Sequence, residues 1–339
     1  MAFSDRISVH AVGQGENALE VDLMRNRGLV YRSFGAPAET LAMENLATGD
    51  LARGQLRVEM IGAPINPSDL IPITGAYGHR IAPPLVAGYE GVGRVVETDE
   101  RDRHLLGQRV LPLRGEGTWQ RYTICDAKRA IAVPDSIADD VAARAYINPL
   151  AAYLMLRAWP VAGRHVLLTA AGSTCAGLLA QWALRQGAAS VLGVTESACH
   201  DNRLRSIGVQ PLRDRDGPAL EAAARRCTTI FDAVGGRLAE SLLAAASTDT
   251  VCVSYGALSG TAVRGPKNVA RQQRFHVRDR LANLGDDVWQ GWFDALWPLL
   301  EGTSLPPTRA YPFGEWKSAL AAFSRRGRTA KPMLMLGPS

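Results

Sequence analysis

The stretch Ile65-Asn66-Pro67-Ser68-Asp69, followed by Thr74-Gly75-Ala76-Tyr77 and Ala87-Gly88-Tyr89-Glu90-Gly91, is the most informative part of this chain. Asn, Pro, Ser and Asp all favour turns, so the first block ends the segment Gln55 to Ile65, which alternates between apolar and polar residues like a half-buried strand. The next two blocks each place a tyrosine beside glycine. The sequence therefore predicts a strand that runs into polar, tyrosine-bearing loops.

The same strand pattern continues on both sides of these blocks. Arg27 to Phe34, Gly91 to Glu97 and Arg109 to Leu113 have it, and Gly and Pro mark their ends. Ile137 to Leu156 instead has helical spacing, which Asn148-Pro149 interrupts. The first part of the chain is therefore predicted to be rich in strands and poor in helices.

Beyond Arg164, short apolar strands alternate with helical segments. Strands are expected at His165–Thr169, Ser190–Val194, Thr229–Ala233 and Thr250–Tyr255, and helices at Cys175–Gln186, in a segment ending at Leu204, and at Leu238–Ala245. Successive strand–helix units of this kind form a parallel, doubly wound sheet.

Together these blocks resemble the zinc-independent branch of the medium-chain dehydrogenase/reductase superfamily, above all the 2-enoyl thioester reductases, with quinone oxidoreductases as close relatives. In zinc-dependent members a Cys stands near the position of Asn66, and Gly-His-Glu stands where Gly88-Tyr89-Glu90 stands here. Asn and Tyr cannot replace the thiolate and imidazole that Zn²⁺ prefers, and the five cysteines include no C-x₂-C pair. We therefore predict no bound metal.

The resemblance implies an α/β protein with two domains, and the length of 339 residues also favours two. Residues 27–147 and 286–339 would form a GroES-like, β-rich catalytic domain, and residues 148–285 a Rossmann domain with a doubly wound parallel sheet. Residues 1–26 are predicted to be an N-terminal extension. Val263 to Val277 would supply the sheet edge of a homodimer.

The same resemblance assigns the chemistry to Tyr77. In the thioester reductases the matching Tyr lies near the substrate carbonyl. Hydride added to the β-carbon of a conjugated enoyl group pushes negative charge onto that carbonyl oxygen, which a hydrogen-bond donor stabilises. Asn66, Tyr89, Phe275 and His276 are the predicted substrate pocket, and His276 stands where the family often has Trp after Phe.

The turn Ala171 to Gly177 is the candidate dinucleotide site, because small residues between a strand and a helix let the backbone approach a pyrophosphate. At the end of the next strand Glu196 favours NADH, whereas Thr195, Ser197, His200 and Arg203 favour NADPH, so NADPH is preferred and NADH stays open. The predicted cofactor-binding residues are Asn66, Ser173, Thr174, Cys175, Ala176, Thr195, Ser197, Arg203, Val234, Gly235, Tyr255, Gly256 and Ala257.

Composition argues against other classes of function. The net charge is +5, but the arginines are spread among acids rather than gathered in the basic stripe that a nucleic-acid groove needs. No apolar run approaches the roughly 20 residues of a membrane helix, residues 1–25 lack the pattern of a signal peptide, and the scattered cysteines suit a reducing compartment, so a cytoplasmic location is expected.

We therefore expect a zinc-independent NADPH-dependent reductase of an α,β-unsaturated carbonyl compound, most suitably an enoyl thioester. Two alternatives stay open: a quinone or enone oxidoreductase, and a nucleotide-binding structural or regulatory protein that has lost turnover.

Overall fold

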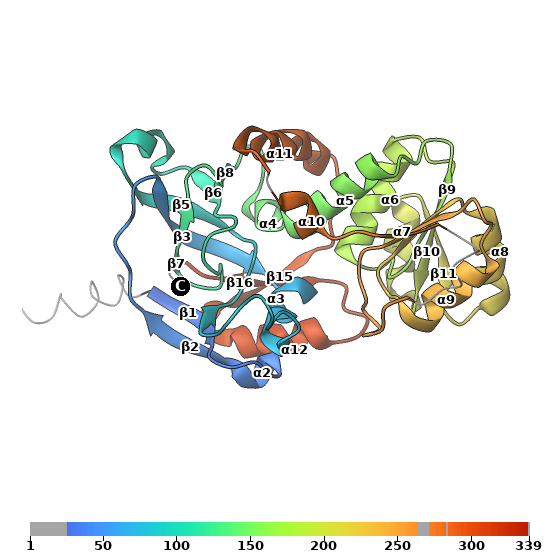
Figure 1. Ribbon diagram of the computed structural model, residues 1–339, viewed down its shortest axis with the longest axis horizontal. Helices are drawn as coiled ribbons and strands as arrows, with labels where there is room; N and C mark the ends of the chain where they lie inside the picture. The colour runs from blue at the N-terminus through green and yellow to red at the C-terminus, as the bar shows by residue number, and fades with distance from the viewer. Residues whose placement is uncertain (1–25, 264–270, 283, 338–339) are drawn as a thin grey trace, which may run out of the picture.

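The computed structural model describes residues 26–263, 271–282 and 284–337 (Figure 1). It has a β-rich lobe and a lobe built on a parallel sheet, with α5 (Ile147–Ala158) lying between them. The predicted α/β class is confirmed. The extension predicted over residues 1–26 lies outside the described residues except for Asn26, which begins the first strand.

The β-rich lobe contains two sheets. The larger sheet has the order β15-β16-β3-β5-β6-β8, and β7 pairs with β3; the smaller has the order β2-β1-β4. Their strands are β1 (Asn26–Tyr31), β2 (Leu41–Leu46), β3 (Gln55–Pro64), β4 (Leu85–Val86), β5 (Val92–Thr98), β6 (Arg109–Leu111), β7 (Tyr122–Asp126), β8 (Ile131–Ala132), β15 (Thr308–Pro312) and β16 (Lys331–Met335).

Strand β3 is central to this lobe because its apolar residues alternate. Leu56, Val58 and Met60 are fully buried and face the second core cluster of the molecule. Pro64 ends the strand, and Pro67 begins α3 (Pro67–Leu70), where proline is well suited to the first helical turn. The sequence block that opens the site therefore follows directly from a rigid strand.

The remaining helices of this lobe are short. They are α2 (Pro37–Thr40), α4 (Asp139–Ala142) and α12 (Trp316–Ser324), with 3₁₀ turns η1 (Pro72–Thr74), η2 (Glu100–Leu105) and η4 (Phe313–Glu315). The prediction that Asn148-Pro149 interrupts the helical segment is wrong: the break lies earlier, between α4 and α5, and Asn148-Pro149 occupies the first turn of α5, where a proline costs no helical hydrogen bond.

The second lobe contains a six-stranded parallel sheet of order β11-β10-β9-β12-β13-β14. Its strands are β9 (His165–Leu168), β10 (Ser190–Thr195), β11 (Val209–Arg213), β12 (Thr229–Asp232), β13 (Val251–Ser254) and β14 (Arg271–Arg274). The chain runs outward from β9 in one direction and from β12 in the other, so the carboxyl ends of these two strands form a topological switch point, where such sheets bind ligands.

Helices cover both faces of this sheet (Figure 1). Helices α5, α6 (Thr174–Arg185) and α7 (Asp201–Ser206) contribute to one core cluster, whereas α8 (Gly217–Arg226) and α9 (Gly236–Ala245) contribute to the other. The 3₁₀ turn η3 (Ala198–His200) precedes α7, and α10 (Val277–Leu281) and α11 (Asp286–Glu301) follow the sheet. The sequence pattern did not indicate β2, β7, β11 or α8.

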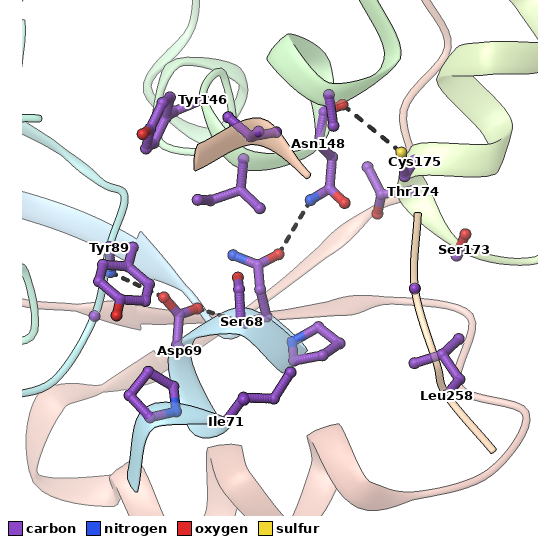
Figure 2. Close-up of a pocket in the computed structure, with 18 of the residues that line it drawn as sticks. Ser68, Asp69, Ile71, Tyr89, Tyr146, Asn148, Ser173, Thr174, Cys175 and Leu258 are labelled. Atoms are coloured by element: carbon purple, nitrogen blue, oxygen red, sulfur yellow. Dashed lines mark hydrogen bonds between the residues drawn. The ribbon is translucent and has the colours of Figure 1, made fainter. Parts of the chain in front are cut away.

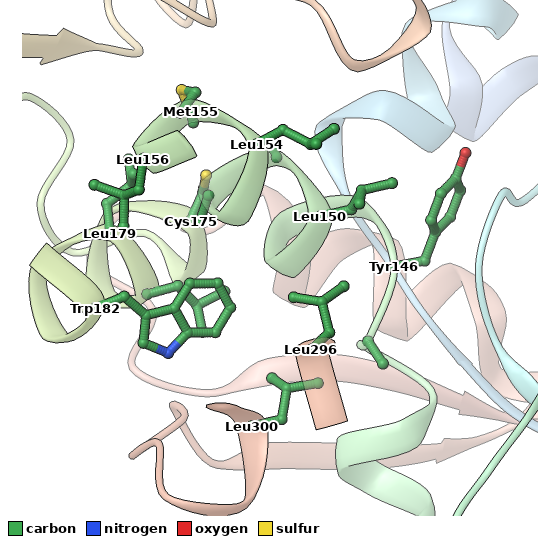
Figure 3. Packing of buried hydrophobic residues seen from close by; sticks show 14 of the residues in the cluster. Tyr146, Leu150, Leu154, Met155, Leu156, Cys175, Leu179, Trp182, Leu296 and Leu300 are labelled. Carbon is green, nitrogen blue, oxygen red and sulfur yellow. The ribbon is translucent and has the colours of Figure 1, made fainter. Parts of the chain in front are cut away.

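The largest core cluster joins α5, α6 and α11 (Figure 3). Leu150 on α5, Trp182 of α6 and Leu296 of α11 belong to this cluster, and all three are almost completely buried. Burial of a side chain of this size contributes about 1.5–3 kcal/mol. Helices α5 and α6 both begin at the edge of a cleft that is lined by residues of both lobes. This packing therefore fixes the position of the two helix ends that face the cleft.

Candidate active site

A cleft with a volume of about 2010 Å³ is lined by residues of both lobes. Figure 2 shows Asp69 and Tyr89 at one end and Ser173, Thr174 and Cys175 at the other, with Asn148 between them. These groups come from α3, from the loop between β4 and β5, from the turn after β9 and from the first turns of α5 and α6. The cleft therefore joins the tyrosine-bearing loops to the carboxyl edge of the parallel sheet.

Asn66 lies at the centre of a buried polar network in the wall of the cleft. Its Oδ1 accepts hydrogen bonds from Asn148 Nδ2, at 3.1 Å, and from Lys331 Nζ, and its Nδ2 donates to Glu90 Oε1 at 2.7 Å. Its backbone N–H donates to Asp69 Oδ2 at 2.7 Å. Three partners therefore fix both the position and the orientation of the Asn66 carboxamide.

The network holds two carboxylates and one ammonium away from water. Glu90 Oε2 accepts from the backbone N–H of Ile147 at 2.7 Å, and Asp69 Oδ1 accepts from that of Tyr89 at 2.9 Å. Burial raises the pKa of Glu90, and burial with the nearby Glu90 charge raises the pKa of Asp69 to about 7. Burial also lowers the pKa of Lys331 to about 8, although both carboxylates oppose that shift.

The turn after β9 has the features of an anion site. Ala170 has a φ of 47°, in the left-handed region that a non-glycine residue rarely adopts, and Ser173 caps α6 by accepting from the Ala176 N–H at 3.2 Å. A Cβ at Gly172 would lie 2.4 Å from His200 Cδ2, so any larger residue would force the His200 ring to move. The backbone is thereby held close against the positive end of a long helix.

Asp232, at the end of β12, organises the neighbouring loop. Its carboxylate accepts from Thr169 Oγ1 at 2.7 Å and from the N–H groups of Val234 and Gly235, both at 3.0 Å. Thr169 Oγ1 in turn accepts from the Ala233 N–H at 2.8 Å. This fully buried bridge ties together the two strand ends at the switch point.

At the end of β10 the predicted polar residues have mostly protein partners. Arg213 Nη1 donates to Thr195 Oγ1 at 2.7 Å, and Arg203 Nη2 donates to the Gly172 carbonyl at 3.0 Å. Ser197 Oγ lies 3.0 Å from Cys199 Sγ. The hydrogen bond from Arg203 therefore holds the candidate dinucleotide turn in place. A direct contact between Arg203 and a cofactor stays a prediction.

The other end of the cleft is formed around Tyr77. The guanidinium carbons of Arg80 and Arg278 lie 4.4 Å and 4.8 Å from the centroid of its ring. Nearby, burial raises the pKa of the Tyr89 hydroxyl to about 12, although that ring is 43% exposed. Tyr77 and Tyr89 both line the cleft, so two phenols face its interior.

Phe275 and His276 form the wall contributed by the parallel-sheet lobe. Phe275 is buried edge-on against Trp159, with a centroid distance of 6.2 Å. His276 Nδ1 accepts from the Arg278 N–H at 3.2 Å, which caps α10. Burial and the adjacent Arg278 charge lower the pKa of His276, so the neutral imidazole is the favoured form.

Comparison with known proteins agrees with this geometry. Residues 52–135 match the family model of the alcohol dehydrogenase GroES-like domain. A mitochondrial enoyl-[acyl-carrier-protein] reductase of Xenopus tropicalis is 30% identical over 256 residues, which cover 71% of this chain and 72% of the relative. The chain belongs to the zinc-independent medium-chain dehydrogenase/reductase family.

Two solved structures share the fold of this medium-chain reductase. A Bacillus thuringiensis protein with the provisional name NADPH:quinone reductase is 30% identical, has a TM-score of 0.86, and matches over 92% of this chain and 99% of its own. A 2-enoyl thioester reductase of Candida tropicalis, solved with NADP and crotonyl-CoA, has a TM-score of 0.77 at 17% identity, covering 92% of this chain and 100% of that chain.

Most of the predicted site residues of this medium-chain reductase lie in the cleft. Those that line it are Asn66, Tyr77, Tyr89, Ser173, Thr174, Cys175, Thr195, Ser197, Val234, Tyr255, Gly256, Ala257, Phe275 and His276. Ala176, Arg203 and Gly235 do not line it: the Ala176 and Gly235 amides bind Ser173 and Asp232, and Arg203 binds Gly172. The lining residues that were not predicted include Asn148, Arg278 and Lys331.

These three residues differ in whether the sequence alone could have placed them in the cleft. Asn148 lies in the Asn-Pro pair that the sequence already marked, and its side chain could have been assigned to the cleft on that ground. Lys331 lies 265 residues from Asn66, so no local spacing could have joined them. Arg278 lies two residues after the predicted His276, on a helix that the sequence pattern did not indicate.

Within residues 26–263, 271–282 and 284–337, no group of three or more His, Cys, Asp or Glu side chains is arranged to hold a metal ion. In the same described part, no helix is both long and apolar enough to cross a membrane.

The donor set at the parallel-sheet end fits a dinucleotide. The turn offers the backbone amides of the α6 N-terminus, and Ser173 and Tyr255 add hydroxyl groups to the same end of the cleft. Amide and hydroxyl donors of this kind suit the phosphates and ribose of a dinucleotide.

Proposed function

We propose that this protein reduces the C=C bond of an α,β-unsaturated carbonyl compound with NADPH, and that an enoyl thioester is its substrate class. The observation that carries the proposal is the position of Tyr77 at the end of the cleft opposite the dinucleotide turn. The Xenopus relative is named for enoyl reduction, and the Candida tropicalis structure holds NADP and crotonyl-CoA, which supports the same reaction here.

The protein groups have separate tasks in this reaction. Bound NADPH would supply a hydride to the β-carbon of the substrate. The Tyr77 hydroxyl would donate to the carbonyl oxygen as negative charge develops there, and then it, or a water that it orders, would protonate the α-carbon. The fixed Asn66 carboxamide would position the reacting groups.

The direct test is NADPH oxidation with three acceptors. We expect turnover of crotonyl-CoA to exceed turnover of a benzoquinone at equal concentration. A preference for the quinone would instead favour the quinone oxidoreductase alternative, which the 30% identity with the Bacillus thuringiensis protein supports. Inactivity on crotonyl-CoA, the quinone and a simple enone, with NADPH binding intact, would favour the nucleotide-binding protein without turnover.

We further propose that the preference for NADPH comes from a basic loop of the β-rich lobe. Arg325, Arg326 and Arg328 line the cleft, and a Cβ on the intervening Gly327 would lie 3.5 Å from Cys199 Sγ, just beyond β10. Arg328 Nη1 donates to the Phe323 carbonyl at 2.7 Å, which anchors the loop. The two neighbouring guanidiniums are then available for a 2′-phosphate.

Replacing both Arg325 and Arg326 by Gln is expected to weaken NADPH binding by about tenfold or more and to leave NADH binding within about twofold, because only NADPH carries the phosphate. Arg203→Ala, which removes the brace at Gly172, is expected to weaken both cofactors alike. Fluorescence titration with each nucleotide measures these constants. A selective loss of NADPH affinity in Arg203→Ala alone would assign the phosphate to Arg203 instead.

The oligomeric state and location are also proposals. The exposed strand β14 ends the parallel sheet, so its free edge can pair with the same strand of a second copy. Residues 264–270 of the predicted edge lie outside the described residues. A homodimeric mass by light scattering would support this pairing, and a monomer would refute it. A cytoplasmic location is proposed from the sequence, although the Xenopus relative is mitochondrial.

A further inference from the structure

Arg278 makes several contacts at the end of the cleft that is formed around Tyr77. Besides its position over the Tyr77 ring, its Nη2 lies 3.3 Å from His276 Nε2. Arg278 belongs to α10, whereas Arg80 belongs to the loop that carries Tyr77. Cations from both lobes therefore meet at the residue proposed to contact the substrate carbonyl.

The positive charge at this point is not neutralised by ion pairing. Among the described residues, Arg80, Arg274 and Arg278 form no salt bridge with a carboxylate, and Arg274 and Arg278 line the cleft. Asp279 is the acidic neighbour whose charge opposes theirs at His276. A cleft wall with unpaired guanidiniums attracts an anionic group and repels a cationic one.

We infer that the substrate carries a carboxylate close to its conjugated carbonyl group, and that Arg278 binds this carboxylate with help from Arg80 and Arg274. This inference rests on the proposed reduction of a C=C bond. It goes beyond that proposal because the reduction of a plain fatty enoyl chain requires no anionic group on the substrate. Guanidinium binds carboxylate through two parallel hydrogen bonds, and exposed Arg278 has donors free to do so.

A phosphate on the thioester carrier is the other possible anion. In coenzyme A and in phosphopantetheine, the phosphates are separated from the thioester by the whole pantetheine arm. Arg80 and Arg278 instead lie within 5 Å of the ring of the residue that would contact the carbonyl, at 4.4 Å and 4.8 Å from its centroid. The distance therefore favours a carboxylate on the acceptor itself.

The test compares two thioesters of N-acetylcysteamine, a carrier without phosphate. One carries trans-2-pentenoate, and the other carries its analogue in which a carboxylate replaces the terminal methyl group. We expect kcat/KM with NADPH to be at least about tenfold higher for the carboxylate analogue, and Arg278→Gln to reduce this ratio by about tenfold. Arg157→Gln is the matched control, because Arg157 stacks on Tyr153 outside the cleft and should leave the ratio unchanged.

A ratio at or below one in the unmodified protein, or an unchanged ratio in Arg278→Gln, would overturn the inference. Arg278→Gln could instead lower only the ratio of kcat/KM for pentenoyl-CoA to kcat/KM for the pentenoyl N-acetylcysteamine ester. In that case the cations would bind the carrier phosphate, and the carboxylate assignment would be wrong. If the protein reduced none of the four substrates, namely the two N-acetylcysteamine esters, pentenoyl-CoA and crotonyl-CoA, the proposed function itself would be refuted. Failure of the carboxylate assignment alone would leave crotonyl-CoA reduction intact.

Discussion

Tyr77→Phe is expected to lower kcat for crotonyl-CoA reduction by about a hundredfold while KM changes by less than about threefold. Removing a single donor from a developing oxyanion typically costs two to three orders of magnitude in kcat. The ring would keep its contacts with Arg80 and Arg278, so the loop should keep its conformation. Steady-state NADPH oxidation measures both constants.

Tyr153→Phe provides the matched control. Tyr153 also carries a stacked guanidinium, 5.5 Å from its centroid, and its hydroxyl accepts a hydrogen bond from Arg157 at 3.0 Å, but it does not line the cleft. Its substitution should leave kcat unchanged. An undiminished kcat in Tyr77→Phe would show that another group stabilises the enolate.

Lys331→Met is expected to have the largest effect on stability. It would leave the buried carboxylates of Asp69 and Glu90 without the ammonium that lowers the pKa of both. Leaving a buried charge without its compensating charge typically destabilises a protein by about 3–5 kcal/mol. Denaturant unfolding should show this loss, whereas Lys317→Met, at an exposed lysine over Trp316, should change stability by less than about 1 kcal/mol.

The pH dependence of this loss has a definite sign. Below about pH 7 the folded state holds a proton on Asp69, whose pKa is raised, so a missing ammonium matters less there. As pH rises toward 8 that carboxylate ionises while Lys331, with a pKa of about 8, still carries most of its charge. The deficit of Lys331→Met should therefore be larger at pH 7.5 than at pH 5.5.

A second substitution separates charge from packing. Adding Glu90→Gln to Lys331→Met removes one of the two buried carboxylates and keeps the hydrogen bond to Asn66 possible, so it should recover part of the stability at pH 7.5. A deficit that does not change with pH, and no recovery in the double variant, would mean that Lys331 contributes by packing alone.

Local sequence patterns reveal only those features of the fold that depend on neighbouring positions. Strand β3 and the turn around Ser173 were predictable because alternation and small residues are properties of neighbouring positions. Strand β11 was not, since Val209–Arg213 includes a proline and is only partly buried, which weakens the apolar pattern. The Asn66–Lys331 contact depends on the pairing of β16 with β3, which no local spacing encodes.

The polar network around Asn66 also has a consequence for the order of events during synthesis. Its members come from positions 66, 90, 148 and 331, and the last of these enters on β16. A nascent chain that has not yet reached β16 has the cofactor turn and both tyrosines but lacks this closing strand. We therefore expect chains truncated before β16 to remain inert.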